Sequence, residues 1–192
     1  MSTPGRLSHV AQDYLAAFCA ILDDMIRDMT QAELTDSISH NFIVQMIPHH
    51  RAAIEMSNNI LKYTTNVPLQ EIATQIVSEQ TKSIEDMHRI EASCSECRNT
   101  KQELFLYQRR MDQILQTMFT EMGGARGTNR LDCDFMWEMI PHHRGAVRMA
   151  NNALCFAICP GLKPILHSII TSQERGIRQM NRLLQRIGCP IS

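Results

Sequence analysis

The chain has 192 residues, of which 44% are hydrophobic and 20% charged, as is typical of a folded protein with one domain or two small ones. Its formal net charge is −1 and no basic patch stands out, so we expect no nucleic-acid partner. No run approaches the roughly 18 apolar residues that a membrane helix needs, and residues 1–13 lack the apolar core of a signal peptide. We therefore expect no membrane contact and a cytoplasmic location.

Three helices are predicted in the first half of the chain. Apolar residues recur every three or four positions over residues 7–30, 39–63 and 67–92, which is the spacing of amphipathic helices. Asn66 and Pro68 have the cap and first-turn chemistry that begins the third helix. Pro48 lies inside the second helix. It is expected either to kink this helix or to begin its main part after a separate turn.

The second half of the chain repeats the first. The stretch MIPHHR begins at Met46 and recurs at Met139, an offset of 139 − 46 = 93 that holds over all three helices without an insertion. Further helices are therefore predicted from residue 101, over residues 131–156 and over residues 165–187.

This offset predicts a tandem duplication with units at residues 1–99 and 100–192. A single three-helix unit of this length has a thin core. We therefore predict an all-α, antiparallel helical bundle in which the two repeats dock about a pseudo-twofold axis and bury both histidine-bearing faces.

Methionine is abundant, with 13 residues, and five positions carry it in both halves. A methionine on an apolar stripe usually fills space, and leucine would fill the same space. Its presence in both halves therefore makes the thioether a candidate ligand for a soft metal ion. The pairs are Met25 with Met118, Met29 with Met122, Met46 with Met139, Met56 with Met149, and Met87 with Met180.

Each half also carries two adjacent histidines among these methionines. The first pair, His49 and His50, points in directions about 100° apart around the helix. Met46 lies one turn before them and Met56 two turns after His49, so a thioether and an imidazole can reach one ion. Imidazole binds Cu, Zn, Fe and Ni, whereas thioether strongly favours Cu(I).

We predict metal ligands in both halves from this pattern. The alternative is that one histidine of each pair is hydrogen-bonded in the core and the other partly exposed. The predicted ligands are Met46, His49, His50, Met56, Met139, His142, His143 and Met149, and the site could be extended by Met25, Met29, Met87, Met118, Met122 and Met180.

Gln80 and Gln173 are polar members of otherwise apolar faces. A buried amide needs hydrogen-bond partners. Each glutamine is expected either to bridge helices or to accept the N–H of a metal-binding imidazole, which would fix its tautomer.

The seven cysteines are odd in number, have no repeating spacing and follow no export signal, so we expect reduced thiols. Cys94 and Cys97 form one C-x-x-C pair, which alone is a weak zinc signal. Cys94, Cys97 and Cys189 lie at the ends of corresponding helices, so auxiliary metal binding by these three is the alternative.

A di-iron site of the carboxylate type is disfavoured. Such sites use Glu-x-x-His on two helices, and Glu85 with His88 gives this spacing once. The matching positions in the other half are Arg178 and Asn181, which cannot complete it.

The duplicated motif resembles that of a known bacterial family, the domain of unknown function 305, which is grouped with ferritin-like helical bundles. The family pattern is Met-x-Pro-His-His, then Ala and Met on the same helix and Gln, Ile and Met on the next, after a helix with Met-x-x-x-Met. The resemblance covers nearly the whole chain, twice. It implies a four-helix arrangement and, for some members, copper binding through His and Met. The matching residues are Met46, Pro48, His49, His50, Ala53, Met56, Gln80, Ile84 and Met87, and again Met139, Pro141, His142, His143, Ala146, Met149, Gln173, Ile177 and Met180.

Two features depart from the family. Ser83 and Gly176 stand where members often carry Glu, and many relatives are exported whereas this chain has no export signal. The leading interpretation is a small, non-enzymatic protein that sequesters or buffers a soft transition metal, with copper favoured. A metal ion is the expected partner, and self-association is left open. The alternatives are a structural or interaction module without metal and a ferritin-like redox enzyme with carboxylate ligands.

Overall fold

The computed structural model describes residues 6–124 and 127–189, which contain six α-helices and no β-strand. This confirms the predicted all-α class, and the observed bounds lie within a few residues of those expected from the sequence. The helices are α1 (His9–Thr30), α2 (Ile38–Ile60), α3 (Val67–Cys94), α4 (Lys101–Gly123), α5 (Leu131–Leu154) and α6 (Leu162–Arg186).

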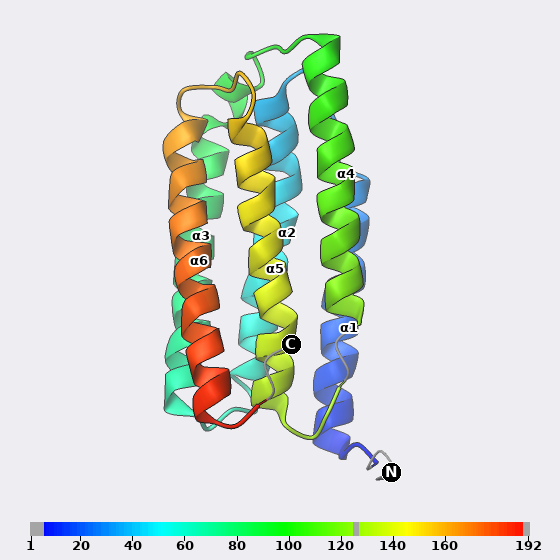
Figure 1. Cartoon of the computed structure of the whole chain (residues 1–192), viewed down its shortest axis with the longest axis vertical. Helices are drawn as coiled ribbons and strands as arrows, with labels where there is room; N and C mark the ends of the chain where they lie inside the picture. Colours follow the sequence, from blue (N-terminus) through cyan, green and yellow to red (C-terminus); the bar gives the residue numbers. More distant parts are fainter. Residues whose placement is uncertain (1–5, 125–126, 190–192) are drawn as a thin grey trace.

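Four of the helices form a closed ring. Helix α2 packs against α3, α3 against α6, α6 against α5, and α5 against α2, while α1 covers α2 and α4 covers α5. Successive helices run in opposite directions along the long axis of the molecule (Figure 1). The bundle therefore places the two motif-bearing helices, α2 and α5, side by side at its centre. The division at residue 99, the pseudo-twofold axis and the ferritin-like class stay predictions.

Local sequence explains where the helices begin. Ser8, Ser37, Asn66 and Thr100 each accept a backbone N–H of the first turn of their helix through the side chain, which satisfies a donor that has no partner inside the helix. Helix α2 continues through Pro48. The alternative that Pro48 begins this helix after a separate turn is therefore wrong.

The core is rich in methionine. Every methionine among the described residues is buried, together with the paired aromatic residues Tyr14 and Tyr107. The amide of Asn59 donates to the carbonyl of Tyr14 and that of Asn152 to the carbonyl of Tyr107, both at 3.1 Å. These matching bonds tie α1 to α2 and α4 to α5.

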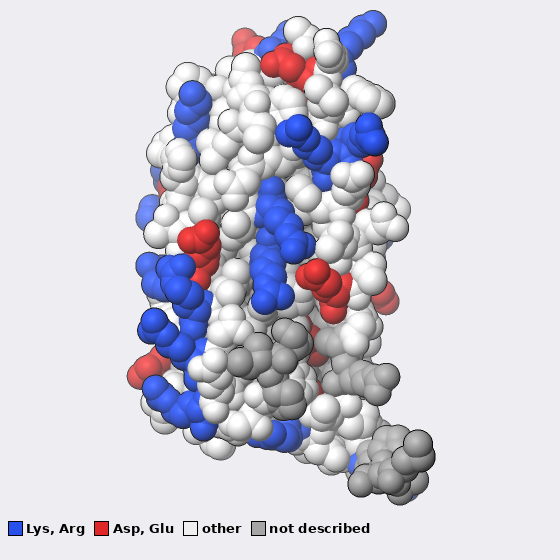
Figure 2. Space-filling model, in the orientation of Figure 1, with Lys and Arg blue, Asp and Glu red and all other residues white. Residues whose placement is uncertain are grey.

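Most charged side chains of the described residues lie on the outside of the bundle, whereas Asp134 and Glu138 are buried. On the face shown in Figure 2, Lys and Arg form several groups with Asp and Glu between them. No described helix has an apolar stretch of the length that a bilayer crossing requires.

Four cysteines form disulfides, which corrects the expectation of reduced thiols. Cys94, at the end of α3, is bonded to Cys159 in the loop before α6, and Cys133 in α5 is bonded to Cys189 after α6. The partners are 65 and 56 residues apart in the sequence, so only the fold brings them together. Cys94 and Cys189 are therefore not available as auxiliary metal ligands in this state, and Cys97 is a free thiol.

Reduction of the two bridges is expected to destabilise the fold. Loss of a cross-link that closes a loop of this length lowers the free energy of unfolding by about 4 kcal/mol, mainly because the unfolded chain gains freedom. Urea unfolding of Cys94→Ser/Cys159→Ser should therefore have a much lower midpoint than the native protein. The matched control is Cys19→Ser/Cys155→Ser, which removes two exposed free thiols and should leave the midpoint unchanged. Thiol titration that finds seven free cysteines in the native protein, instead of 7 − 4 = 3, would refute the pairing.

Candidate metal centre

All four motif histidines are buried in the structure. His49, His50, His142 and His143 are at most 2% exposed. The alternative in which one histidine of each pair is partly exposed is therefore wrong. The fold places both pairs between hydrophobic helices, where an imidazole must find a partner inside the protein.

His49 and His142 stack on each other where α2 meets α5. Their ring centroids lie 3.6 Å apart and the planes are inclined by 27°. The Nε2 atom of His49 lies 3.2 Å from the carbonyl oxygen of His142, and the Nε2 atom of His142 lies 3.1 Å from the carbonyl oxygen of His49. Each ring thus donates to the backbone of the other helix.

These two bonds fix the tautomer of both rings. A carbonyl oxygen can only accept, so Nε2 must carry the proton in His49 and in His142. In a neutral imidazole the other nitrogen, Nδ1, then has a free lone pair, which is the form that binds a metal. Neither Nδ1 atom has a hydrogen-bond partner among the described residues.

The second histidine of each pair differs between the halves. The Nε2 atom of His50 lies 3.1 Å from the hydroxyl of Ser83 on α3. At the matching position α6 has Gly176, where an added Cβ would lie 2.9 Å from Nε2 of His143. His143 therefore rests on bare backbone. The Nδ1 atoms of His50 and His143 also have no hydrogen-bond partner among the described residues. We refer to the four unpartnered Nδ1 atoms of the motif histidines as the open Nδ1 atoms.

Burial keeps all four rings neutral. It lowers the pKa of His50 to about 3 and that of His142 to about 4. The pKa values of His49 and His143 also lie well below the usual value, first because of burial and second because a charge on His142 would repel their own. At neutral pH the rings can therefore act as ligands without first losing a proton.

Thioether sulfur lies close to this region. A Cβ added to Gly145 would lie 2.1 Å from Sδ of Met118, so this sulfur sits directly on the α5 backbone. Gly145 is three residues after His142, or about one helical turn. The other predicted ligands Met46, Met56, Met139 and Met149, and the additional candidates Met25, Met29, Met87, Met122 and Met180, are all buried in the same core.

The two glutamines have the burial expected of them but not the expected bonds. Both amide atoms of Gln80, and Oε1 of Gln173, lack a hydrogen-bond partner within residues 6–124 and 127–189. The described contacts of Gln80 therefore support neither a bridge between helices nor a bond to an imidazole. Unpartnered buried amides are rare in proteins and call for water or a ligand.

The donor set fits a soft metal ion and not a hard one. No three His, Cys, Asp or Glu side chains of the described residues are grouped so that they could hold a metal. Glu85 and His88, the one di-iron-like spacing, are both exposed. A metal in the core would therefore need sulfur ligands as well as nitrogen ligands, and the buried methionines provide thioether sulfur.

Three polar features of the core were missed by the sequence analysis. Ser83 stood out in the sequence only as a departure from the family pattern, and its contact with His50 was not expected. The backbone carbonyls that fix the central tautomers carry no sequence signal. The third is a buried bond of 2.6 Å from the hydroxyl of Tyr14 to Oε2 of Glu138. Its sequence signal is Glu138 itself, an acidic residue in the predicted inner region of a helix.

The fold and site define an all-α protein with imidazole and thioether groups enclosed at the centre of a bundle. The chain belongs to the family described as "Domain of unknown function (DUF305)", whose model matches residues 20–91 and 39–184. This confirms the family resemblance seen in the motif.

One solved structure is similar to the chain over most of its length. It is CopM in a silver-bound form obtained by soaking, with 26% sequence identity and a TM-score of 0.58. The match covers 79% of this chain and 98% of that one. A search of curated proteins finds no match.

Proposed function

We propose that the protein binds a soft monovalent metal ion, Cu(I) or an ion of the same chemistry, and sequesters or buffers it in the bundle core. The observation that carries this proposal is the pair of open Nδ1 atoms on His49 and His142. Their protons are held on Nε2 by backbone carbonyls, so two lone pairs remain in a core rich in thioethers. The similarity to a silver-bound protein supports the proposal, because Ag(I) shares the preference of Cu(I) for soft ligands.

The proposed roles follow from chemistry and position. His49 and His142 are the central nitrogen ligands, and His50 and His143 are further ones. Met46, Met56, Met139 and Met149 supply sulfur, and Met118, whose sulfur lies against the α5 backbone at Gly145, is an additional candidate. The protein itself needs no catalytic group for this role.

The competing function is a structural or interaction module. The observation in its favour is that the stacked rings already join α2 to α5 through reciprocal hydrogen bonds. In that case the open Nδ1 atoms would lower the stability slightly without having a function, and added metals would not change the stability of the protein. A redox enzyme of the carboxylate type has less support, since the described residues show no suitable carboxylate cluster.

The compartment is part of the proposal. Disulfides persist in oxidising environments and are rare in the cytosol. The two bridges therefore favour an oxidising compartment over the cytoplasmic location expected from the sequence.

Competition titration tests the function. Cu(I) is added to the protein, with its disulfides intact, in the presence of a coloured Cu(I) chelator, and Zn(II) is tested separately. We expect Cu(I) to be withdrawn from the chelator and Zn(II) to bind far more weakly, because thioethers are poor ligands for it. If the chelator keeps its Cu(I) at every protein concentration and the metal does not change the melting temperature of the protein, the protein is the structural module.

A further inference from the structure

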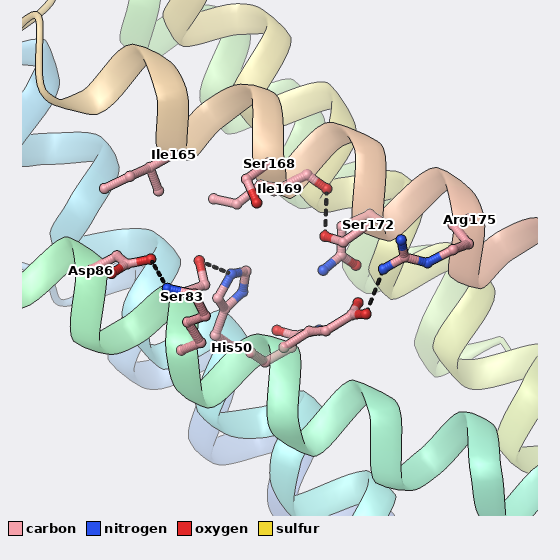
Figure 3. A pocket seen from close by; sticks show the side chains of 12 residues that line it. His50, Ser83, Asp86, Ile165, Ser168, Ile169, Ser172 and Arg175 are labelled. Carbon is pink, nitrogen blue, oxygen red and sulfur yellow. Dashed lines mark hydrogen bonds and ion pairs between the residues drawn. The ribbon is translucent and has the colours of Figure 1, made fainter.

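A slot between α3 and α6, lined by polar and apolar side chains, leads from the surface to a buried histidine of the core. Its volume is about 220 Å³, and its walls include His50, Gln80 and Ser83 on one side and Ser168 and Ser172 on the other. In Figure 3 the imidazole of His50 reaches towards Ser83 on α3, and the serines of α6 lie across the opening. The slot therefore connects the surface with a ring that is only 1% exposed.

Short side chains on α6 make room for the slot. Ser168 and Ser172 are the offset-93 counterparts of Gln75 and Glu79 on α3. Those longer side chains reach across to the other helix, where Gln179 donates to Gln75 at 3.4 Å and Arg175 pairs with Glu79. The second half thus has shorter side chains than the first at these matching positions. The two serines line the same slot as His50.

The lining of the slot combines apolar side chains, among them Ile165 and Ile169, with polar groups that have unused bonding capacity. Gln80 is 2% exposed and lines the slot, and neither of its amide atoms has a partner in the described parts of the chain. Gln173 also lines the slot, and its amide oxygen likewise has no hydrogen-bond partner among the described residues. A cavity of this size with several unpartnered polar groups in its wall has room and partners for water. The same amide and hydroxyl oxygens can replace the water shell of an ion as it moves inwards.

Charged groups surround the mouth in pairs of opposite sign. Glu79 of α3 and Arg175 of α6 form an ion pair between the two helices, and Lys82 bonds to Asp86 at 3.1 Å on the α3 side. The pair that spans both helices is partly exposed, so it is held only weakly and can open.

We propose that this slot is the port through which a soft monovalent cation enters and leaves the core, with His50 as the first imidazole that it meets. The port rests on the proposed function and gives the metal its route. The ion loses water to the hydroxyls and amides of the slot, displaces the bond between Ser83 and His50, and continues to the central histidines. The Glu79–Arg175 pair acts as the closure of the mouth.

The test compares rates of metal exchange in variants that fill or open the slot. Stopped-flow absorbance follows Cu(I) as it passes between a coloured chelator and the full-length protein in both directions. Filling the slot by Ser168→Leu/Ser172→Leu should slow loading and release by about tenfold, a barrier increase of about 1.4 kcal/mol, with the equilibrium affinity unchanged. Removing the closure by Arg175→Ala should speed both directions.

The matched control is Thr171→Leu, which adds the same side chain to an exposed position of α6 outside the slot. Its exchange rates should equal those of the unmodified protein. If the filled variant binds Cu(I) with normal affinity and normal rates, or if Arg175→Ala slows exchange, the port is refuted although metal binding stands. If the unmodified protein binds no Cu(I) at equilibrium, the proposed function and the port fail together, and the equilibrium titration identifies this case.

Discussion

The metal-free protein is expected to unfold as the pH falls from about 6 to about 4. In the unfolded chain a histidine takes up a proton near pH 6.5. In the folded protein burial lowers the pKa of His50 to about 3 and of His142 to about 4, and those of His49 and His143 are lowered as well. Below pH 6.5 the unfolded state therefore binds more protons, and stability is lost until the folded pKa values are reached.

The size of this effect is large because four residues act together. Each contributes about 1.4 kcal/mol of lost stability per pH unit in that range, so the four together reach roughly 5 kcal/mol per unit. A domain of this kind has only about 5–15 kcal/mol in total. Glu138 acts in the opposite direction, because burial raises its pKa and the fold regains stability as this group is protonated. The buried carboxyl of Asp134 has a raised pKa for the same reason and acts in the same direction as Glu138, so two groups oppose the four histidines.

Far-UV circular dichroism during acid titration measures this prediction. The variant His50→Gln/His143→Gln removes two of the four groups and should move the midpoint to lower pH. Bound Ag(I) should do the same for the unmodified protein, because a metal holds imidazole in its neutral form. Cooperative folding that persists unchanged at pH 3.5 would show that these rings can accept protons where they lie.

Replacing the stacked pair by phenylalanine is expected to abolish most metal binding while the bundle still folds. His49→Phe/His142→Phe keeps two stacked rings but removes both Nδ1 lone pairs and the two donated bonds. Loss of first ligands should weaken Cu(I) binding by more than the roughly 10–100-fold that is typical for residues supporting a ligand. The cost in stability should be only about 1–3 kcal/mol, because the space stays filled.

The control for this pair is His167→Phe, which changes an exposed histidine of α6. It should leave the Cu(I) affinity unchanged. Chelator competition gives the affinity and urea unfolding gives the stability of the same samples. A phenylalanine pair that binds Cu(I) as well as the unmodified protein would assign His49 and His142 to packing alone.

Much of the fold could be predicted from the sequence, because its signals are periodic. The apolar spacing predicted the helices, and the offset of 93 predicted that the helices carrying Met46 and Met139 would lie in equivalent, buried places. Both residues do lie in the core. The helix pattern continued through Pro48 and so does α2, since tertiary packing outweighs the loss of one hydrogen bond.

The site could be predicted only as a set of residue types. The sequence favoured an imidazole and a thioether of the same helix, whereas the closest imidazole contact joins His49 to His142 across two helices. Tautomers depend on backbone carbonyls of the partner helix, which no motif encodes. The disulfide of Cys94 with Cys159 was missed because the odd number and irregular spacing of the cysteines do not show which of them the fold brings together.

The proposed metal binding at the centre of the bundle depends most directly on where the protons of the central imidazoles lie and on which nitrogen would bind the metal. Nitrogen-15 NMR of the histidine side chains, recorded before and after addition of Ag(I) at neutral pH, measures both. We predict that His49 and His142 are neutral with the proton on Nε2, and that Ag(I) shifts their Nδ1 resonances while Nε2 stays protonated. Protons found on Nδ1, or Nδ1 resonances that do not move when silver binds, would contradict this assignment of the ligands.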